Sequence, residues 1–391
     1  MKNFSYYNPT RVHFGIGEFN NLGRYAAQLG KKALLVKMDG PLEKLGVYAK
    51  AKKLMEEAGM TVCELTGVTA NPKLTKIEEG VRICKTEGID VVIPVGGGSC
   101  IDSAKAIAYG ALDDGDLWDF FELKRVAAAS LPIGAVSTIA ATGSEMNVNC
   151  VVTNDRDVDP ANWRKWSTHF EHSFPKFAII DPELQKTLPK YVTACGMVDI
   201  ISHVMEPYFD EEPNTPIQDA IGEGIIRTVI SSEGVLDDSE NLEHRANLSW
   251  AATLAINGWA DVGRAGKPWD AHTIEHDIGA ITDCAHGAGL AVAHIAWLRH
   301  LNRKDPEKFV KFAKNVFGFQ QDDLSDHEFG EMGIDWLKTH FNKWGMPVTL
   351  KDLGLNKSVL PLIAKKITQN PEGTILNEAE VLAVLTDCYD A

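Results

Sequence analysis

Three histidines lie close together in the stretch Trp269–Gly289 of this 391-residue chain. His272 and His276 are spaced i, i+4, so on a helix both rings would leave the same face. His286 follows after Gly279, where a glycine permits a bend. Because neutral imidazole is the commonest metal ligand in proteins, the stretch predicts a metal or catalytic site. The alternative is three unrelated histidines at the surface or at helix ends.

A second candidate site lies in the stretch Gly196–Met205, where Asp199 and His203 are again spaced i, i+4 among mostly apolar neighbours. A carboxylate buried in such a helix costs several kcal/mol unless it is paired or bound to a cation. An Asp–His ion pair along the helix would satisfy both groups. Together with two of the three histidines above, however, this pair would supply three nitrogens and one oxygen to a divalent transition metal.

Gly96, Gly97, Gly98 and Ser99 follow a strand-like apolar run and precede a helical pattern. Glycines let a backbone approach a ligand closely, and the N-terminus of a helix offers free N–H groups to an anion. We expect Ser99 to cap this helix and Asp102 to lie in its first turn. The pattern predicts a phosphate site. A tight strand-to-helix turn is the alternative, since the usual G-x-G-x-x-G spacing is absent.

A hydroxyl-rich loop, residues 137–145, follows another apolar run. Doubly wound folds bind their ligands at the carboxyl ends of such strands, so we expect the loop at a ligand site. An ordinary polar loop is the alternative.

The elements that must position these residues differ between the two halves of the chain. The first half alternates short apolar runs with helical patterns, which predicts a parallel, doubly wound sheet with helices around it. The expected strands are 11–14, 33–36, 61–65, 91–95, 131–136 and 177–180, and the expected helices are 22–29, 45–58, 75–87 and 100–111. Thr75 and Glu78 have the spacing of a capping box, and the tract 153–175 is the most loop-like part of this half.

After residue 185 strand-like runs nearly vanish, and helical patterns predict an all-α domain. The expected helices are 193–209, 217–230, 242–259, 269–300, 308–317, 335–344, 359–368 and 378–389. We therefore divide the chain into an α/β nucleotide-binding domain, residues 1–185, and a helical metal-binding domain, residues 186–391.

Composition excludes several kinds of partner and location. The net charge of −15 argues against nucleic acid and anionic membranes. No apolar run reaches the roughly 18 residues that a membrane-spanning helix needs, and the first residues do not have the pattern of a signal peptide. The seven cysteines are scattered and contain no C-x-x-C pair, which is typical of reduced thiols in a cytoplasmic protein.

Taken together, the motifs resemble those of the iron-containing, or group III, alcohol dehydrogenases, and most closely the branch of butanol dehydrogenases and broad aldehyde reductases. The resemblance covers nearly the whole chain. It rests on Asn8-Pro9-Thr10-Arg11, Gly96-Gly97-Gly98-Ser99-x2-Asp102-x2-Lys105, Ala141-Thr142-Gly143-Ser144-Glu145, Ile180-Asp181-Pro182, Gly196-x2-Asp199-x3-His203, Ala246-Asn247-Leu248-x-Trp250-Ala251-Ala252-Thr253 and His272-x3-His276-x9-His286-Gly287.

The resemblance implies a dehydroquinate synthase-like fold and one metal ion, iron or zinc, held by Asp199, His203, His272 and His286. It implies that His276 lies near the nicotinamide and the substrate instead, where it is our candidate proton relay. The implied reaction is hydride transfer between NAD(P)H and a small primary alcohol or aldehyde such as butanol or its aldehyde. A homodimer is also expected.

By the same resemblance, the glycine loop and Asp102 belong to the site that holds the cofactor pyrophosphate. Thr138 and Thr142 match hydroxyls that line the cofactor cleft, and Lys165 is in register with a lysine near the cofactor. Trp269, Asn147 and Asn149 are candidates for the substrate pocket.

One departure from the family pattern concerns cofactor choice. Relatives in this branch that prefer NADP carry a Gly-Gly-Gly-Ser turn where this chain has Met38-Asp39-Gly40-Pro41. Pro41 offers neither a hydroxyl nor an N–H donor, and Asp39 can accept from the ribose hydroxyls while repelling a 2′-phosphate. We therefore predict NAD(H) over NADP(H). The alternative is that Asp39 only makes the turn.

Two rival functions share parts of this pattern. A dehydroquinate-synthase-like lyase would bind NAD and a metal on the same two-domain plan, but the helical half shows no obvious basic cluster for a phosphorylated substrate. A non-catalytic metal- and nucleotide-binding protein would keep both sites without turnover.

Overall fold

The chain forms two compact units in a computed structural model that describes residues 1–266 and 269–390. Residues 7–187 make the first, or α/β, unit, and residues 1–6 join the chain from Leu188 onward in the second, or helical, unit. The first six residues therefore pack with the helices, whereas the sequence-based division places them in the first domain. No described helix is long and apolar enough to cross a lipid bilayer.

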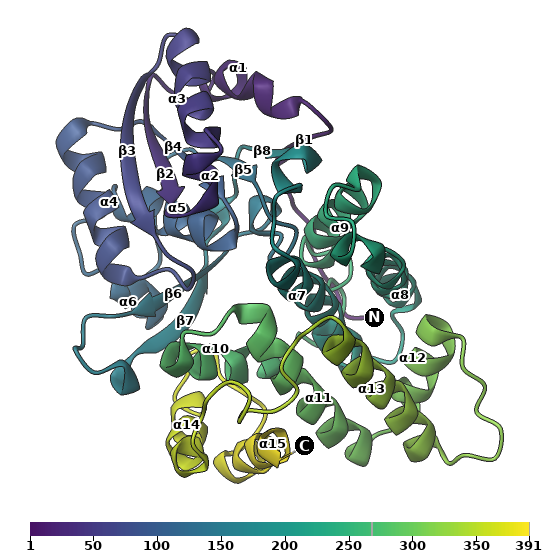
Figure 1. Ribbon diagram of the computed structural model, residues 1–391. Helices are drawn as coiled ribbons and strands as arrows, with labels where there is room; N and C mark the ends of the chain where they lie inside the picture. Colours follow the sequence, from purple (N-terminus) through teal and green to yellow (C-terminus); the bar gives the residue numbers. More distant parts are fainter. Residues whose placement is uncertain (267–268, 391) are drawn as a thin grey trace. The chain divides into compact units, whose positions relative to one another are not determined.

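The α/β unit is built on a sheet of six parallel strands among its described residues, in the order β1-β8-β5-β4-β2-β3 (Figure 1). This confirms the predicted parallel, doubly wound sheet. The strands are β1 (Arg11–Phe14), β2 (Lys32–Met38), β3 (Thr61–Val68), β4 (Val91–Gly96), β5 (Gly134–Ser137) and β8 (Phe177–Ile180). β4 and β5 pair at Val95↔Val136 and Gly96↔Ser137. The glycine loop and the hydroxyl-rich loop therefore leave the sheet side by side, at its carboxyl edge.

Helices cover both faces of this sheet because the side chains of β2 alternate between two cores. Ala33 and Leu35 pack in one core with α1 and α3, and Leu34 and Val36 pack in the other with α4 and α5. The helices of the unit are α1 (Leu22–Ala26), α2 (Pro41–Lys44), α3 (Val47–Glu57), α4 (Leu74–Glu87), α5 (Gly98–Gly110) and α6 (Trp118–Phe121). The helix expected over 45–58 begins only after Gly46, whose φ of 71° separates α2 from α3.

The tract expected to be a loop contains a strand. β6 (Asn149–Asn154) and β7 (Arg164–His169) form an antiparallel pair beside the main sheet. β7 reads Arg-Lys-Trp-Ser-Thr-His, and its buried positions include Lys165 and Thr168. Lys165 and Thr168 point to opposite faces of the strand, and two buried polar residues hide the alternation of hydropathy from which strands are predicted.

The predicted capping box at Thr75 and Glu78 is wrong. α4 begins at Leu74, and the Thr75 hydroxyl donates to Asp155 at 2.6 Å. Glu78 is instead ion-paired with Arg156. Both side chains therefore bind the segment after β6 and not the N-terminus of their own helix.

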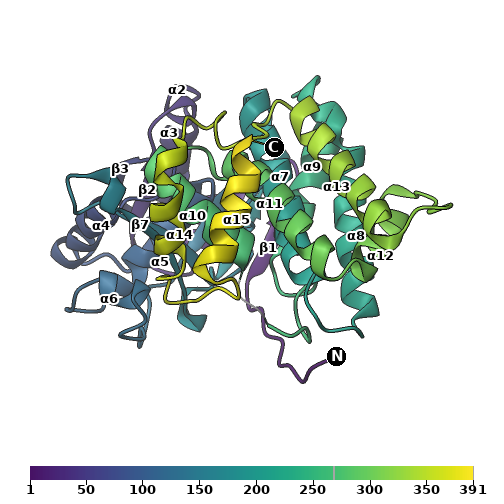
Figure 2. The ribbon, with the colours of Figure 1, turned by 90° about the horizontal axis from the view of Figure 1, so that it is seen from below.

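The helical unit packs around α11, which contacts α7, α10, α13 and α15. Figure 2 shows α14 and α15 side by side beside α10 and α11. The helices are α7 (Lys190–Tyr208), α8 (Pro216–Ser231), α9 (Leu242–Ala255), α10 (Asp270–Thr282), α11 (His286–Lys304), α12 (Glu307–Phe317), α13 (Asp326–Lys343), α14 (Leu360–Ile367) and α15 (Glu378–Asp390). α13 begins earlier than expected because Ser325 and Glu328 form a capping box in front of it.

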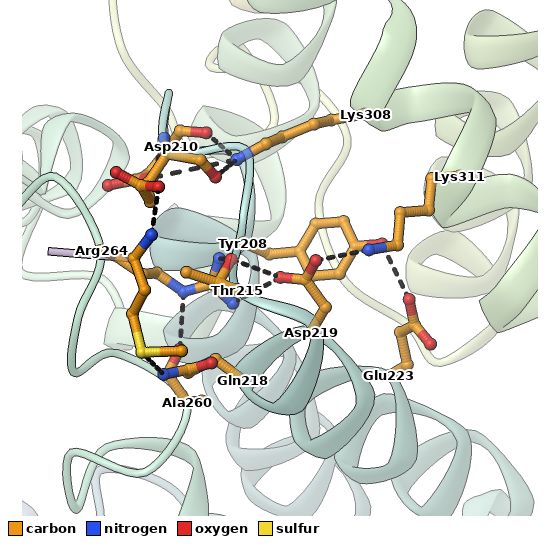
Figure 3. Close-up of polar contacts among 12 residues, drawn as sticks. Tyr208, Asp210, Thr215, Gln218, Asp219, Glu223, Ala260, Arg264, Lys308 and Lys311 are labelled. Carbon is orange, nitrogen blue, oxygen red and sulfur yellow. Dashed lines mark hydrogen bonds and ion pairs between the residues drawn. The ribbon is translucent and has the colours of Figure 1, made fainter.

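A buried polar network fixes the C-terminal end of α7 (Figure 3). The Tyr208 hydroxyl donates to Glu223 of α8 at 2.9 Å. Asp219, also on α8, is paired with Arg264 at 2.9 Å and with Lys311 of α12 at 2.5 Å. Since a buried carboxylate is costly unless it is paired, these contacts hold α7, α8 and α12 in one arrangement.

Candidate metal and nucleotide sites

The predicted metal ligands of the helical unit converge on one carboxylate oxygen. Oδ1 of Asp199 lies 3.5 Å from Nε2 of His203, 3.9 Å from Nε2 of His272 and 3.6 Å from Nε2 of His286. Two ligands bound tetrahedrally to one ion at about 2.1 Å lie roughly 3.4 Å from each other. The separations are therefore those expected of ligands around a shared ion.

Buried polar atoms without hydrogen-bond partners favour an ion at the same position. Oδ1 of Asp199 and Nε2 of His272 are buried and have no such partner. An Asp–His hydrogen bond along the helix would need a separation of about 2.8 Å, but His203 stands 3.5 Å away. The donor set of imidazole nitrogens and one carboxylate oxygen suits a divalent transition ion, so these residues fit a metal.

Two glutamates that the sequence analysis missed orient the histidine rings. Oε1 of Glu206 accepts from Nδ1 of His272 at 2.5 Å, and Glu275 accepts from Nδ1 of His286. Both glutamates are buried. Each leaves Nε2 of its histidine to face Asp199, and such carboxylate partners fix the tautomer and orientation of a ligating histidine.

These hydrogen bonds also rank the possible ligand groups. Three groups of described residues have ligand atoms within 4.8 Å of one another: Asp199 with His272 and His286, Glu206 with His272 and His294, and Glu275 with His276 and His286. In the second and third groups the carboxylate already accepts a hydrogen bond from a histidine. The Asp199 group is the one whose carboxylate oxygen has no hydrogen-bond partner. We count His203 with this group, because its Nε2 lies 3.5 Å from the same oxygen.

Helix geometry explains the convergence. Asp199, His203 and Glu206 are spaced i, i+4, i+7 on α7, so they share one face of a helix that is buried throughout its second half. Glu206 was therefore visible in the sequence as the next polar residue on the metal-facing side of α7.

His286 reaches the group from the start of the next helix. Gly279 permits a bend but makes none, because α10 continues to Thr282 and the chain turns at Asp283, where φ is 53°. Asp283 adopts the left-handed conformation that asparagine and aspartate tolerate better than most residues. His286 is then the first residue of α11.

The charges of the group suit a cation. Burial lowers the pKa of His203 to about 4 against the pull of Asp199, so this ring is neutral near pH 7. Burial would raise the pKa of Asp199, but His203, His272 and His286 together lower it to about 2. Burial would lower the pKa of His272, yet Glu206 and Asp199 raise it to about 9, so His272 holds a proton that a metal would displace.

His276 lies beside this group. Its side chain is buried, and its ring centre is 6.4 Å from that of His272 and 5.7 Å from that of His286. Trp269, at the start of α10, places its ring 5.2 Å from His272. Both rings therefore lie directly beside the Asp199 group.

The glycine loop of the α/β unit leads directly into α5. The helix begins at Gly98 with Gly97 as its N-cap, so the prediction that Ser99 caps it is wrong, and no acidic residue lies in its first turn. A Cβ on Gly97 would collide with Ile139, and one on Gly98 would collide with Thr142. The first N–H groups of the helix have no acceptor within it, so this turn fits the pyrophosphate of a dinucleotide.

Asp102 lies deeper in α5 than expected. Its Oδ1 accepts from the Ser144 hydroxyl at 2.5 Å, and its Oδ2 accepts from the Val151 N–H at 3.0 Å. Burial raises its pKa, which nearby Lys105 and these hydrogen bonds partly offset. Both oxygens of Asp102 thus hold the hydroxyl-rich loop and the strand that follows it. Lys165, buried in β7, also lowers the pKa of Asp102.

Lys105 strengthens this attachment from one turn further along α5. Its fully buried ammonium donates to Ser144 at 2.8 Å, to Asn147 at 3.1 Å and to the carbonyl of Asn149 at 2.7 Å. Asn147 also donates to the carbonyl of Gly143 at 2.9 Å. Asn147, a candidate for the substrate pocket, is therefore engaged in holding the loop.

The remaining cofactor candidates lie at the same carboxyl edge. Thr138 is buried, and its N–H donates to the carbonyl of Gly96 at 3.0 Å, which joins the two loops. Thr142 packs against Gly98. Asp39 follows β2, the next strand of the sheet, in a pocket lined by Lys37, Met38, Asp39, Gly40, Glu43, Lys44 and Thr66.

Comparison with known proteins gives matches along nearly the whole chain. Residues 9–182 match the family described as iron-containing alcohol dehydrogenase, and residues 193–389 match the C-terminal domain of the Fe-containing alcohol dehydrogenase family. The chain is 40% identical to the probable NADH-dependent butanol dehydrogenase 1 of Bacillus subtilis, over 98% of this chain and 99% of that one. It is 35% identical to NADH-dependent butanol dehydrogenase A of Clostridium acetobutylicum, over 100% of both chains. The crystal structure of NADH-dependent butanol dehydrogenase A from Thermotoga maritima matches with a TM-score of 0.94 and 39% identity, covering 100% of this chain and 99% of that one.

Proposed function

Because the chain belongs to the iron-containing alcohol dehydrogenase family, we propose that it transfers hydride between NAD(H) and a small primary alcohol or aldehyde. As a member of this family it is an NAD(P)-dependent oxidoreductase with the dehydroquinate synthase-like architecture. The choice of NAD over NADP, the butanol-like substrate and the identity of the metal are the parts that we propose. The lyase alternative is not favoured, since the relatives are named butanol dehydrogenases.

The observation that carries the proposal is the position of Asp199 among three imidazole nitrogens. Its unpartnered Oδ1 lies 3.5–3.9 Å from Nε2 of His203, His272 and His286. We propose that these four side chains hold one divalent ion, iron or zinc, since both metals accept such ligands.

The bound ion would act as a Lewis acid on the alcohol or aldehyde oxygen, and the nicotinamide would accept or supply the hydride. The protein's own groups prepare this chemistry. Glu206 and Glu275 hold the rings of His272 and His286 with Nε2 toward Asp199. His276, buried beside them, would take up or give back the hydroxyl proton, because an imidazole can do both near neutral pH.

We propose that the α/β unit binds the cofactor along the carboxyl edge of its sheet. The N-terminus of α5 and the glycine loop would hold the pyrophosphate, with Thr138, Thr142 and Lys165 in the surrounding wall. The adenosine ribose would lie in the pocket beside Asp39, whose carboxylate would accept from both ribose hydroxyls and repel a 2′-phosphate.

One assay tests the proposal. The purified protein is stripped with a chelator, refilled with Fe²⁺ or Zn²⁺, and supplied with NADH or NADPH and a series of short aldehydes. We expect aldehyde-dependent oxidation of NADH that requires the metal. Activity that survives complete removal of metal would overturn the metal centre, and a clear preference for NADPH would overturn the cofactor assignment. Consumption of phosphorylated sugars without net NADH oxidation would favour the lyase.

We also propose a homodimer that works in the cytoplasm. β1 is an edge strand of the sheet, and its unpaired backbone groups could pair with a second copy of the chain. All seven cysteines are free thiols, as a reducing compartment would keep them. Light scattering after size exclusion would reveal a monomer, and cell fractionation would reveal another location.

A further inference from the structure

We propose that Glu43 is a second determinant of cofactor choice, because it pairs with Lys37 in a pocket whose two lysines, Lys37 and Lys44, could otherwise receive a 2′-phosphate. The inference rests on the proposed function, which assigns the adenosine ribose to this pocket. Lys37, Glu43 and Lys44 all line the pocket beside Asp39.

Lys37 is near the carboxyl end of β2, and its side chain is only 8% exposed. Its ammonium lies 2.6 Å from a carboxylate oxygen of Glu64 on β3 and 3.3 Å from one of Glu43 on α2. Glu64 is shared, since Lys52 of α3 binds its other oxygen at 2.8 Å. The Glu64 carboxylate therefore pairs with two lysines, and Glu43 is the second carboxylate beside Lys37.

The charged residues that line the pocket cancel one another. Its lining contains two cations, Lys37 and Lys44, and two carboxylates, Asp39 and Glu43. The sum is zero, which suits an uncharged ribose hydroxyl and offers nothing to a phosphate that carries nearly two negative charges. Replacing Glu43 with glutamine would leave the lining with one net positive charge and leave Asp39 in place.

Glu43 is suited to this role because its side chain is 60% exposed. Glu43→Gln keeps its size and removes no core contact, so the variant is expected to fold. Asp39 and Glu43 then act by different means: Asp39 can accept hydrogen bonds from the ribose, whereas Glu43 offsets part of the positive charge of Lys37.

The test measures nucleotide fragments that differ only at the 2′ position. Dissociation constants of 5′-AMP and 2′,5′-ADP are determined by calorimetry on the metal-replete protein, wild type and Glu43→Gln, at low and high salt. We expect Glu43→Gln to tighten 2′,5′-ADP about three- to tenfold relative to 5′-AMP at low salt, and less at 0.5 M salt, because the interaction is between partly exposed charges. The same shift is expected for NADPH relative to NADH.

A matched control lies on the same strand. Lys32, at the other end of β2, is paired with Glu87 at 3.0 Å. Glu87→Gln changes the charge of the protein by the same amount. It should leave the ratio of the dissociation constants of 5′-AMP and 2′,5′-ADP unchanged. Adding Lys37→Gln to Glu43→Gln should remove most of the gain.

The inference is overturned if Glu43→Gln changes the ratio no more than Glu87→Gln, or if the gain persists fully without Lys37. It is supported if the gain needs both the loss of Glu43 and the presence of Lys37. If the wild type binds neither 5′-AMP nor NADH, the proposed nucleotide site itself is wrong. That result is separate from a failure of Glu43 to affect selectivity.

Discussion

Glu206 offers the sharpest test of the metal centre, because it controls a proton that the metal must displace. Its carboxylate accepts from Nδ1 of His272 at 2.5 Å and from the backbone N–H groups of His272 at 2.8 Å and Ala271 at 3.2 Å. With Asp199 on the other side, it raises the pKa of His272 to about 9 although burial acts in the opposite direction. Glu206→Gln keeps the shape of the side chain and removes the charge.

The magnitude follows from this pKa. A pH of 7 is about two units below the pKa of His272, so nearly every metal-free molecule carries this proton on His272. Displacing it costs about 2.7 kcal/mol at roughly 1.36 kcal/mol per unit. The raised pKa means that the proton is held below pH 9 and lost above it. Metal affinity should therefore rise about 50-fold between pH 7 and pH 9 and then level off.

Calorimetry of Zn²⁺ binding to chelator-stripped protein, in buffers of different ionisation enthalpy, counts the protons released. We expect about one proton from His272 at pH 7 in the wild type and close to none in Glu206→Gln, since this variant loses the largest favourable influence on the imidazolium. Glu243→Gln, at an exposed position in the first turn of α9, is the control and should release as many as the wild type. Equal proton release from Glu206→Gln and wild type, or none from the wild type, would refute the reasoning.

Three further outcomes are expected. His286→Ala should abolish metal retention measured by elemental analysis, whereas His276→Ala should retain the metal and lower kcat about 10²- to 10⁴-fold, as loss of a proton relay does; equal metal loss in both would contradict the division of roles. Lys105→Met should lower the free energy of unfolding in urea by about 3–5 kcal/mol, because it leaves buried Asp102 without its nearby cation, and an unchanged midpoint would show that the loop does not need it. Asp39→Asn should weaken NADH binding and tighten NADPH binding, each about tenfold or less, measured by nucleotide fluorescence; a change of the two constants in parallel would exclude charge as the cause.

The sequence predicted the parts of the fold that depend on residues close to one another along the chain. Apolar runs bounded by turn residues predicted the four inner strands of the main sheet, β2, β4, β5 and β8, since a strand buried on both faces needs apolar side chains at nearly every position. The edge strands β1 and β3 are more polar and were predicted from short β-like runs. β7 was missed for the opposite reason, because Lys165 and Thr168 are buried polar residues and leave no apolar alternation. Ser99 and Thr75 are both good capping residues, yet each helix begins two residues earlier than its expected cap requires. Tertiary contacts, such as that of Thr75 with Asp155, outweigh a local preference worth about 1 kcal/mol.

That Asp199 and His203 lie together could be predicted for the same local reason. The orientation of the histidine rings around Asp199 could not. Spacing i, i+4 places Asp199 and His203 on one helix face whatever the rest of the chain does. Which nitrogen of each ring faces the centre depends on Glu206 and Glu275, and Glu275 meets His286 only after the chain has turned at Asp283.

The burial of three carboxylates around the predicted metal site favours a cation bound there. Asp199, Glu206 and Glu275 are 2%, 7% and 0% exposed, so water cannot stabilise their charges. Each would cost several kcal/mol if it stood alone. Glu206 and Glu275 are satisfied by histidine N–H groups, but those hydrogen bonds turn the opposite nitrogens toward Asp199 and leave its Oδ1 without a hydrogen bond. A divalent ion would resolve this arrangement, because it would accept electron pairs from Asp199 and from the Nε2 atoms around it.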